Sequence, residues 1–262
     1  MELSAASPLG KVLRFPLRLL PPQSVLPIMQ GRLRGKRWVV GSTNHGCWLG
    51  TYEVEKRRVF EAIVEENGVV FDIGAHVGFY TLLASVLVGP GGKVIAFEPL
   101  PGNLNFLKRH LRLNYVDNVT VVDAAVCDRS AAACFEEGST SSMGRISPTG
   151  AIQVRTVALD DLVSSGQLPV PDYIKVDVEG TEMSVLSGAK SILERFHPTL
   201  FLAVHTKEIN RECCRFLRAI DYQLTAIDGA AVEECDELLA WLPRPKSRTE
   251  PEHELRSENG EV

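Results

Sequence analysis

The residues with the clearest chemical potential are two carboxylates that each end a short apolar run. Asp72 follows Val69-Val70-Phe71 and opens the glycine turn Asp72-Ile73-Gly74-Ala75-His76-Val77-Gly78. Glu98 follows the apolar run Val94-Ile95-Ala96-Phe97, and a helical segment separates the two runs. A strand, a glycine turn, a helix and a second strand form the unit that holds nucleotide-like ligands at the carboxyl edge of open α/β sheets. The sequence therefore predicts a ligand site at this edge.

The charge of the turn indicates which ligand is bound there. A dinucleotide fingerprint has the pattern G-x-G-x-x-G and places a pyrophosphate at a helix N-terminus, but its second glycine is replaced here by His76. The Asp72 carboxylate would repel a pyrophosphate and attract a sulfonium and an α-ammonium group. Glu98 can accept hydrogen bonds from both ribose hydroxyls. The turn thus favours S-adenosylmethionine, and an NAD-dependent oxidoreductase is the alternative.

A third predicted strand, Val119 to Val122, ends at a corner of small residues beside the second. Small residues leave room for a flat adenine ring, although Asp123 taken alone could be a plain strand-ending acid. The glycines could also serve only to let a helix pack closely. The predicted cofactor contacts are Asp72, Gly74, Ala75, His76, Gly78, Glu98, Asp123, Ala124 and Ala125.

A second set of titratable residues follows two later apolar runs. The run Tyr173 to Val176 ends in Asp177-Val178-Glu179-Gly180, and Thr199 to Val204 ends at His205. Both ends are expected at the carboxyl edge of central strands, where reacting groups gather. An aliphatic hydroxyl is a poor nucleophile until a base removes its proton, so His205, Asp177 and Glu179 are the catalytic candidates.

His205 is the preferred general base, because its ordinary pKa of about 6.5 lies near neutral pH. Asp177 would then orient or stabilise the imidazolium. Structural roles are the alternative: Asp177 could cap a helix, Glu179 could pair with Lys175, and His205 could be an ordinary strand-end residue. The same three side chains could also hold Mg²⁺. We favour the metal-free version, because one histidine with two acids is a loose ligand set.

Five motifs together carry a family resemblance: Trp48-Leu49-Gly50-Thr51-Tyr52-Glu53, Asp72 to Gly78, Phe97-Glu98-Pro99, Ala125-Val126-Cys127-Asp128, and Lys175 to Glu182. On these motifs the chain, from about Gly46 to Pro243, resembles the FkbM-type family of S-adenosylmethionine-dependent methyltransferases. His76 departs from the pattern, since many members carry Asn there.

The resemblance implies an α/β fold of the Rossmann-like class I methyltransferase type. Its sheet would be mostly parallel and seven-stranded with helices on both faces, and its last strand, about Leu238 to Leu242, would be antiparallel. It also implies O-methylation of an alcohol hydroxyl on a sugar or glycan, a polyketide or another small secondary metabolite. A cofactor-binding module without catalysis is the remaining alternative.

Composition sets the domain organisation. The chain has 262 residues, 45% of them hydrophobic and 23% charged, which is typical of one soluble globular domain with appendages. We predict an N-terminal basic and amphipathic arm with short strands over residues 1–50, a cofactor-binding methyltransferase domain over 51–243, and a disordered tail over 244–262.

Charge and cysteine content point to partners and location. Net charge is -5, yet residues 1–37 carry seven Lys/Arg against one acid, so residues 9–37 could contact an anionic membrane or a lipid-linked substrate. The acidic remainder disfavours nucleic acid as substrate. The six cysteines lack metal-pair spacing, and the N-terminal apolar stretch is interrupted by charge and proline, unlike a signal peptide. Both features predict a cytoplasmic protein.

Overall fold

A central sheet of seven strands organises the computed structural model, which describes residues 20–137, 144–146 and 150–242. The spatial order of the strands is β12-β13-β11-β10-β3-β4-β5. In chain order they are β3 (Val69–Ile73), β4 (Lys93–Phe97), β5 (Val119–Val122), β10 (Tyr173–Val176), β11 (Thr199–Ala203), β12 (Gln223–Ala226) and β13 (Glu237–Trp241). Strands β3, β4, β5, β10 and β11 are parallel, whereas β13 is antiparallel to both neighbours. The predicted Rossmann-like sheet and its antiparallel last strand are confirmed.

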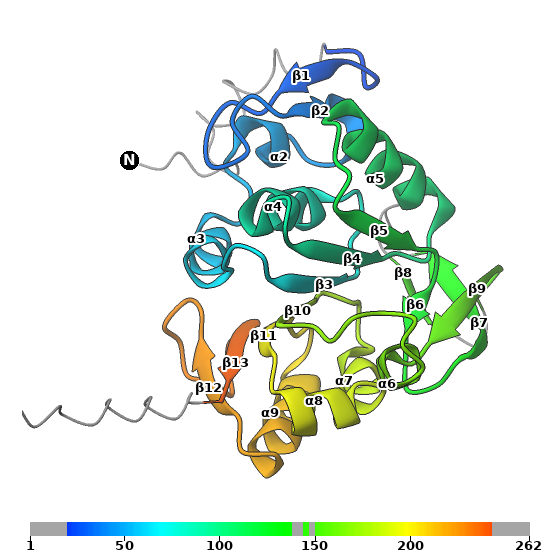
Figure 1. Cartoon of the computed structure of the whole chain (residues 1–262), viewed down its shortest axis with the longest axis vertical. Coiled ribbons are helices and arrows are strands. Elements are labelled where there is room, and N and C mark those ends of the chain that lie inside the picture. Colours follow the sequence, from blue (N-terminus) through cyan, green and yellow to red (C-terminus); the bar gives the residue numbers. More distant parts are fainter. Residues whose placement is uncertain (1–19, 138–143, 147–149, 243–262) are drawn as a thin grey trace, which may run out of the picture.

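Helices cover both faces of this sheet because its strands alternate apolar side chains toward each face (Figure 1). Phe71 and Ile73 of β3 pack with one group of helices: α7 (Glu182–Ser187), α8 (Lys190–Phe196) and α9 (Lys207–Ala219). Val70 packs on the opposite face with α3 (Val54–Ile63) and α4 (Phe79–Val88). The same face carries α5 (Pro101–Leu113) through Leu104 and Leu107. The short helix α6 (Leu159–Ser164) joins the α8 side.

The described part of the N-terminal region packs into the same core. Its elements are β1 (Val25–Pro27), β2 (Arg37–Val39), the 3-10 turn η2 (Val40–Ser42) and α2 (Gly46–Leu49). Trp38 of β2 is fully buried and stacks on His110 of α5 with ring centroids 3.7 Å apart. The backbone N–H of Val39 donates to His110 Nε2 at 3.1 Å. Packing is thus continuous across residue 50, and the proposed division into an arm and a domain remains a prediction.

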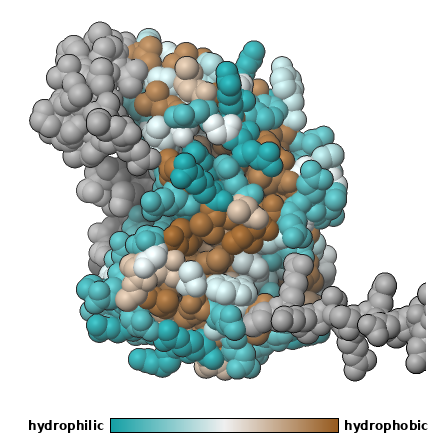
Figure 2. Space-filling model, turned by 90° about the vertical axis from the view of Figure 1, so that its left-hand side faces the viewer, coloured by the Kyte–Doolittle hydropathy of each residue, from teal (hydrophilic) through white to brown (hydrophobic). Residues whose placement is uncertain are grey.

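A second, four-stranded sheet of order β6-β9-β7-β8 follows β5. It consists of β6 (Ala125–Val126), β7 (Ala131–Glu137), β8 (Gly144–Ile146) and β9 (Ile152–Val157). Residues 1–19 of the predicted arm and the predicted tail at 244–262 lie outside the described residues. Within the described ranges, no helix has the length and apolarity of a membrane span. Figure 2 shows a band of hydrophobic residues across one face, bordered by hydrophilic ones.

Candidate active site

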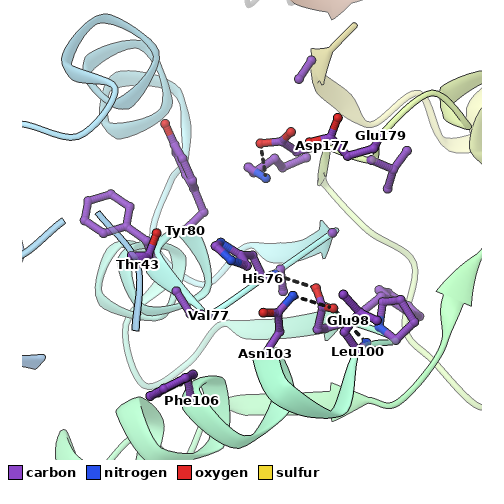
Figure 3. Close-up of a pocket in the computed structure, with 18 of the residues that line it drawn as sticks. Thr43, His76, Val77, Tyr80, Glu98, Leu100, Asn103, Phe106, Asp177 and Glu179 are labelled. Carbon is purple, nitrogen blue, oxygen red and sulfur yellow. Dashed lines mark hydrogen bonds and ion pairs between the residues drawn. The ribbon is translucent and has the colours of Figure 1, made fainter. Parts of the chain in front are cut away.

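A cavity of about 1030 Å³ opens at the carboxyl ends of the central strands. Its size is at the upper end of the range of about 300–1,000 Å³ for small-molecule sites. One part, which we call the turn side, contains Gly74 to Val77, Glu98 to Leu100, Asn103 and Ala124 to Val126. The other part, which we call the acidic side, contains Glu53, Lys175, Asp177, Glu179, His205, Asp236 and Glu237. Figure 3 shows Glu98 and Asn103 across the cavity from Asp177 and Glu179.

Two glycines of the turn allow close packing. Gly74 has φ +76°, and a Cβ there would lie 1.9 Å from the carbonyl oxygen of Asp177. Gly78 has φ +92°, and a Cβ there would lie 2.4 Å from a methyl group of Leu107 in α5. Both positions therefore require glycine for backbone geometry and packing. Gly74 also lines the cavity, whereas Gly78 does not.

Glu98 lies at the end of β4 and holds the turn in place. Its Oε2 accepts from the backbone N–H of His76 at 2.8 Å, and its Oε1 accepts from the N–H of Leu100 at 2.9 Å and from Asn103 Nδ2 at 3.1 Å (Figure 3). Burial raises the pKa of Glu98, while these three donors act to lower it. A carboxylate offers about four lone-pair sites, so the protein already fills most of them. The sequence predicted that Glu98 accepts hydrogen bonds from both ribose hydroxyls. With three protein donors already bound, Glu98 has one acceptor position left for a ribose hydroxyl, on Oε2.

Of the remaining residues predicted to contact the cofactor, some line the cavity and others do not. Ala124 and Ala125 are buried and line it, and their contact with an adenine ring remains a prediction. His76 also lines it, and its Nε2 is buried with no hydrogen-bond partner among the residues that the structure describes. Burial lowers the pKa of His76, which keeps the ring neutral. A free acceptor on Glu98 and small residues at the third corner together fit an adenosine group.

Asp72 and Asp123 lie outside the cavity lining. The Asp72 carboxylate is buried, accepts from Thr81 Oγ1 at 2.6 Å and pairs with Lys175 Nζ at 3.4 Å. Strand alternation directs this carboxylate to the α4 face along with Val70, where Thr81 and Lys175 enclose it below the cavity wall. Asp123 is exposed, and its backbone carbonyl accepts from Arg155 at 3.5 Å. A side-chain contact from either acid to the cofactor therefore lacks support in the geometry.

Asp177 is held by two lysines. Its Oδ2 lies 3.3 Å from Lys175 Nζ and 3.5 Å from Lys56 Nζ, and both lysines are almost completely buried. Burial would raise the pKa of Asp177, but the ammonium groups of Lys175 and Lys56 hold it well below its ordinary value. A carboxylate so stabilised is a poor proton acceptor. The alternative in which Glu179 pairs with Lys175 is not what the structure contains, since Lys175 pairs with Asp72 and Asp177.

His205, two residues after the end of β11, is oriented by a residue that the sequence analysis did not assign to the site. Its Nδ1 lies 2.5 Å from Oε1 of Glu182, whose side chain has no solvent exposure. Its Nε2 lies 3.6 Å from Glu179 and 3.9 Å from Asp177, so the three catalytic candidates are brought together. The hydrogen bond to Glu182 raises the pKa of His205 to about 8, against the effect of burial. The sequence feature that could have indicated Glu182 is its position three residues after Glu179, in the same strand-to-helix motif.

Glu53, Lys56 and Glu237 are further site residues that the sequence analysis did not assign, although Glu53 ends one of the five motifs. Lys56 Nζ lies 2.7 Å from Glu237 and 3.6 Å from Glu53, in addition to its contact with Asp177. These residues come from α3, the segment before it and the start of β13. Among the described residues, no group of three His, Cys, Asp or Glu side chains has the arrangement of a metal site.

Comparisons with known proteins identify the family of the chain. The family model described as Methyltransferase FkbM domain matches residues 72–250. The Hexuronic acid methyltransferase AglP of Haloferax volcanii is 30% identical over 132 residues, which are 50% of this chain and 53% of that protein. The 31-O-demethyl-FK506 methyltransferase FkbM of Streptomyces tacrolimicus is 30% identical over 155 residues, which are 47% of this chain and 59% of that protein.

Among solved structures, the methyltransferase FkbM from Methylobacillus flagellatus KT is 22% identical with a TM-score of 0.48, covering 66% of this chain and 43% of that one. The chain spans 53% to 59% of the length of the two curated relatives. The family match, by contrast, runs from the glycine turn past the antiparallel strand and takes in more than half of the chain. This chain therefore belongs to the FkbM methyltransferase-domain family.

Proposed function

We propose that this protein transfers a methyl group from S-adenosylmethionine to an alcohol oxygen, with His205 as the general base. The observation that carries the proposal is the 2.5 Å contact between His205 Nδ1 and Glu182 at the cavity wall. A buried carboxylate that accepts the Nδ1 proton favours the tautomer in which Nε2 keeps its lone pair. Nε2 is the nitrogen nearer to Glu179 and Asp177, which line the cavity.

The bound cofactor would supply an electrophilic methyl group on its sulfonium. When the bond from sulfur to this methyl group breaks, the sulfur would become a neutral thioether. The acceptor hydroxyl would lose its proton to His205 Nε2 as its oxygen forms the bond to the methyl carbon. The resulting imidazolium would be stabilised by Glu182, Glu179 and Asp177, three carboxylates within 4 Å of its nitrogens. Alignment of oxygen and methyl group in the cavity would supply much of the rate, about 7–11 kcal/mol in favourable cases.

Asp177 has a positioning role in this proposal. Its lowered pKa argues against proton transfer to it, while its charge, 3.9 Å from His205 Nε2, favours the protonated ring. Glu179 is the more exposed of the two and contacts the same nitrogen at 3.6 Å. Both residues would therefore contribute through the pKa of His205.

Cofactor binding and catalysis are tested separately. S-adenosylhomocysteine should raise the melting temperature and NAD should not; the reverse would favour the oxidoreductase alternative. His205→Ala should keep this cofactor response and lose about 10²- to 10⁴-fold in turnover. Unchanged turnover in His205→Ala would remove the histidine from the mechanism. Cofactor binding without turnover of any alcohol would favour the module without catalysis.

The acceptor and the location are further parts of this proposal. We expect a hydroxyl on a sugar or glycan, a polyketide or another small metabolite, in line with the relatives named for a hexuronic acid and for 31-O-demethyl-FK506. Contact of residues 9–37 with an anionic membrane or lipid-linked acceptor would appear as co-sedimentation with anionic but not neutral vesicles. Nucleic acid is not an expected substrate, and a cytoplasmic location remains a prediction.

A further inference from the structure

A second pocket, of about 240 Å³, lies outside the active site, between the start of β2 and the end of α5. It is lined by Arg37, Arg109, Arg112, Leu113 and Tyr115, so three of its five lining residues are arginines. None of these residues lines the active-site cavity. The volume is below the range of about 300–1,000 Å³ for sites of drug-sized molecules. The pocket therefore suits a small anionic group.

The two segments that form this pocket are basic and contain no acid. Neither residues 20–52, which include β1 and β2, nor residues 99–116, which include α5, contain Asp or Glu. Their Lys and Arg residues are Arg32, Arg34, Lys36 and Arg37 in the first segment and Lys108, Arg109 and Arg112 in the second. Figure 1 shows β1 and β2 beside α5, and the stacking of Trp38 on His110 joins the two segments. They thus form one basic surface on a chain whose net charge is -5.

The protein does not neutralise the arginines of the pocket. Within the described ranges, no carboxylate forms an ion pair with any of the three, in contrast to the paired arginines of α3 and α9. Arg109 donates to the side-chain and backbone oxygens of Gln23, and Arg112 Nε donates to the carbonyl oxygen of Lys108 at 3.3 Å. Because these acceptors are neutral, each guanidinium group keeps its full positive charge.

Hydrogen bonds between β2 and α5 hold the pocket together. Asn114 Oδ1 accepts from the backbone N–H of Arg37 at 2.7 Å, and Asn114 Nδ2 donates to the carbonyl oxygen of Arg37 at 2.9 Å. The last turn of α5 is also closed, since the carbonyls of His110 and Arg112 accept from the N–H groups of Asn114 and Tyr115. The arginine side chains are therefore not required to satisfy these carbonyls, and their remaining donors are available to a ligand.

Tyr115 places an aromatic ring at the pocket. It is 88% exposed, more than any other exposed large hydrophobic residue in the described part of the chain. A tyrosine has an apolar ring and a polar hydroxyl, and for this reason tyrosine is enriched at the boundary between a bilayer and water. An exposed tyrosine beside arginines therefore indicates a ligand with an anionic group and an adjoining less polar part.

We propose that this pocket binds a phosphate group, carried by a lipid headgroup or by a soluble phosphate ester. A guanidinium group offers parallel N–H donors that match two oxygens of a phosphate, which a lysine cannot do. The inference does not depend on the proposed methyl transfer, because the pocket and the active-site cavity share no residue. It also differs from membrane contact through residues 9–37, since Arg109 and Arg112 belong to α5.

Two probes on the full chain distinguish the sources of the phosphate. Glycerol 3-phosphate, with glycerol as the uncharged control, is titrated by calorimetry. Vesicles of phosphatidylcholine with and without phosphatidic acid are tested by co-sedimentation at constant ionic strength. A soluble source predicts saturable binding of glycerol 3-phosphate without vesicle binding. A lipid source predicts binding to the vesicles with phosphatidic acid, which glycerol 3-phosphate weakens by competition.

The double variant Arg109→Gln with Arg112→Gln should reduce binding of the phosphate probe about 25-fold, because each arginine near an anionic surface contributes about fivefold. Arg109→Lys with Arg112→Lys keeps both charges but loses the paired donors, so it should bind severalfold more weakly than wild type. The matched control is Arg211→Gln with Arg215→Gln, which removes two charges from an exposed face of α9 outside both pockets. Melting temperatures show whether each variant folds.

A loss of binding confined to the two pocket variants would support the phosphate site. Absence of saturable binding of both probes to wild type would overturn it. So would a glutamine pair or a lysine pair that binds as tightly as wild type, or an equal loss in the α9 control. None of these measurements involves the cofactor, so their failure would leave the methyl-transfer proposal unaffected.

Discussion

Lys56 of α3 and Glu237 of β13 form an ion pair of 2.7 Å between residues 181 positions apart in the chain. The same ammonium group lies 3.5 Å from Asp177, after β10. One buried lysine thus connects the helix before the sheet, the central strand and the antiparallel strand. It also fixes three of the carboxylates that line the cavity.

Replacing this lysine should therefore destabilise the fold. Lys56→Met leaves Glu237, Asp177 and Glu53 without their shared cation, and removing one partner of a buried pair costs about 3–5 kcal/mol. Since these carboxylates are about 30% exposed, we expect a loss nearer to about 2–3 kcal/mol in the free energy of unfolding. Urea denaturation measures it. Lys190→Met, from an exposed pair on α8, should cost under about 0.5 kcal/mol; equal losses in the two variants would contradict this assignment.

The pH dependence of turnover should report His205. Its pKa is raised to about 8, chiefly by Glu182, and the base must be neutral to accept a proton. Turnover should therefore be low at pH 6, rise through pH 8 and level off above it. The free energy of unfolding should depend on pH in the opposite direction. Because the pKa of His205 is higher in the folded state, the protonated ring stabilises the fold fully below the unfolded-state pKa of about 6.5. This contribution is lost as pH rises through about 8.

Glu182→Gln is the variant that tests the cause of this shift. Without the carboxylate, the pKa of His205 should fall, and the rise in turnover should move to lower pH while the plateau also drops through poorer orientation. Profiles of kcat/KM between pH 5.5 and 9.5 measure the inflection. Glu234→Gln, which removes an exposed acid outside the cavity lining, is the control. An inflection near pH 8 that persists in Glu182→Gln would show that another group titrates.

Cofactor affinity should depend on Glu98 in two ways. Glu98→Ala removes the acceptor for a ribose hydroxyl and also the acceptor of the His76, Leu100 and Asn103 donors. A hydrogen bond to a charged group is worth about 1.5–3 kcal/mol, so affinity for S-adenosylhomocysteine should fall about 10- to 150-fold. Calorimetric titration gives the constant, with Asp117→Ala, an exposed acid outside the cavity lining, as control. A near-normal affinity of Glu98→Ala for S-adenosylhomocysteine would contradict the assignment of Glu98 to the ribose.

Removal of divalent metal tests the choice between histidine and Mg²⁺. In the proposed mechanism, extensive dialysis against a chelator leaves turnover unchanged, because the proton is taken by His205. The measurement compares chelated wild type, chelated wild type with added Mg²⁺, and Asp177→Asn under both conditions. Loss of activity that Mg²⁺ alone restores would replace the histidine mechanism by a metal-assisted one.

The sequence by itself determined the sheet and the edge at which the chemistry gathers. Apolar runs that end at Glu98, Asp177 and His205, with helices between them, place these residues together because the carboxyl ends of parallel strands meet at one edge. Period-two alternation also places Asp72 on the face of Val70 rather than that of Phe71, whereas its position away from the cavity depends on the tertiary contacts with Lys175 and Thr81. The glycine turn was equally visible, and its glycines prove to serve packing against Asp177 and Leu107.

The tertiary structure alone decided the protonation chemistry and the charge of the cavity. The pKa values of His205 and Asp177 depend on Glu182, Lys56 and Lys175, and Lys56 lies 121 residues before Asp177. Local patterns carry no information on the pairs of Lys56 with Asp177 and Glu237, because these pairs form only when β13 pairs with β11 and α3 packs over the sheet. Electrostatic effects depend on distance and burial in three dimensions, and the order of residues along the chain fixes neither.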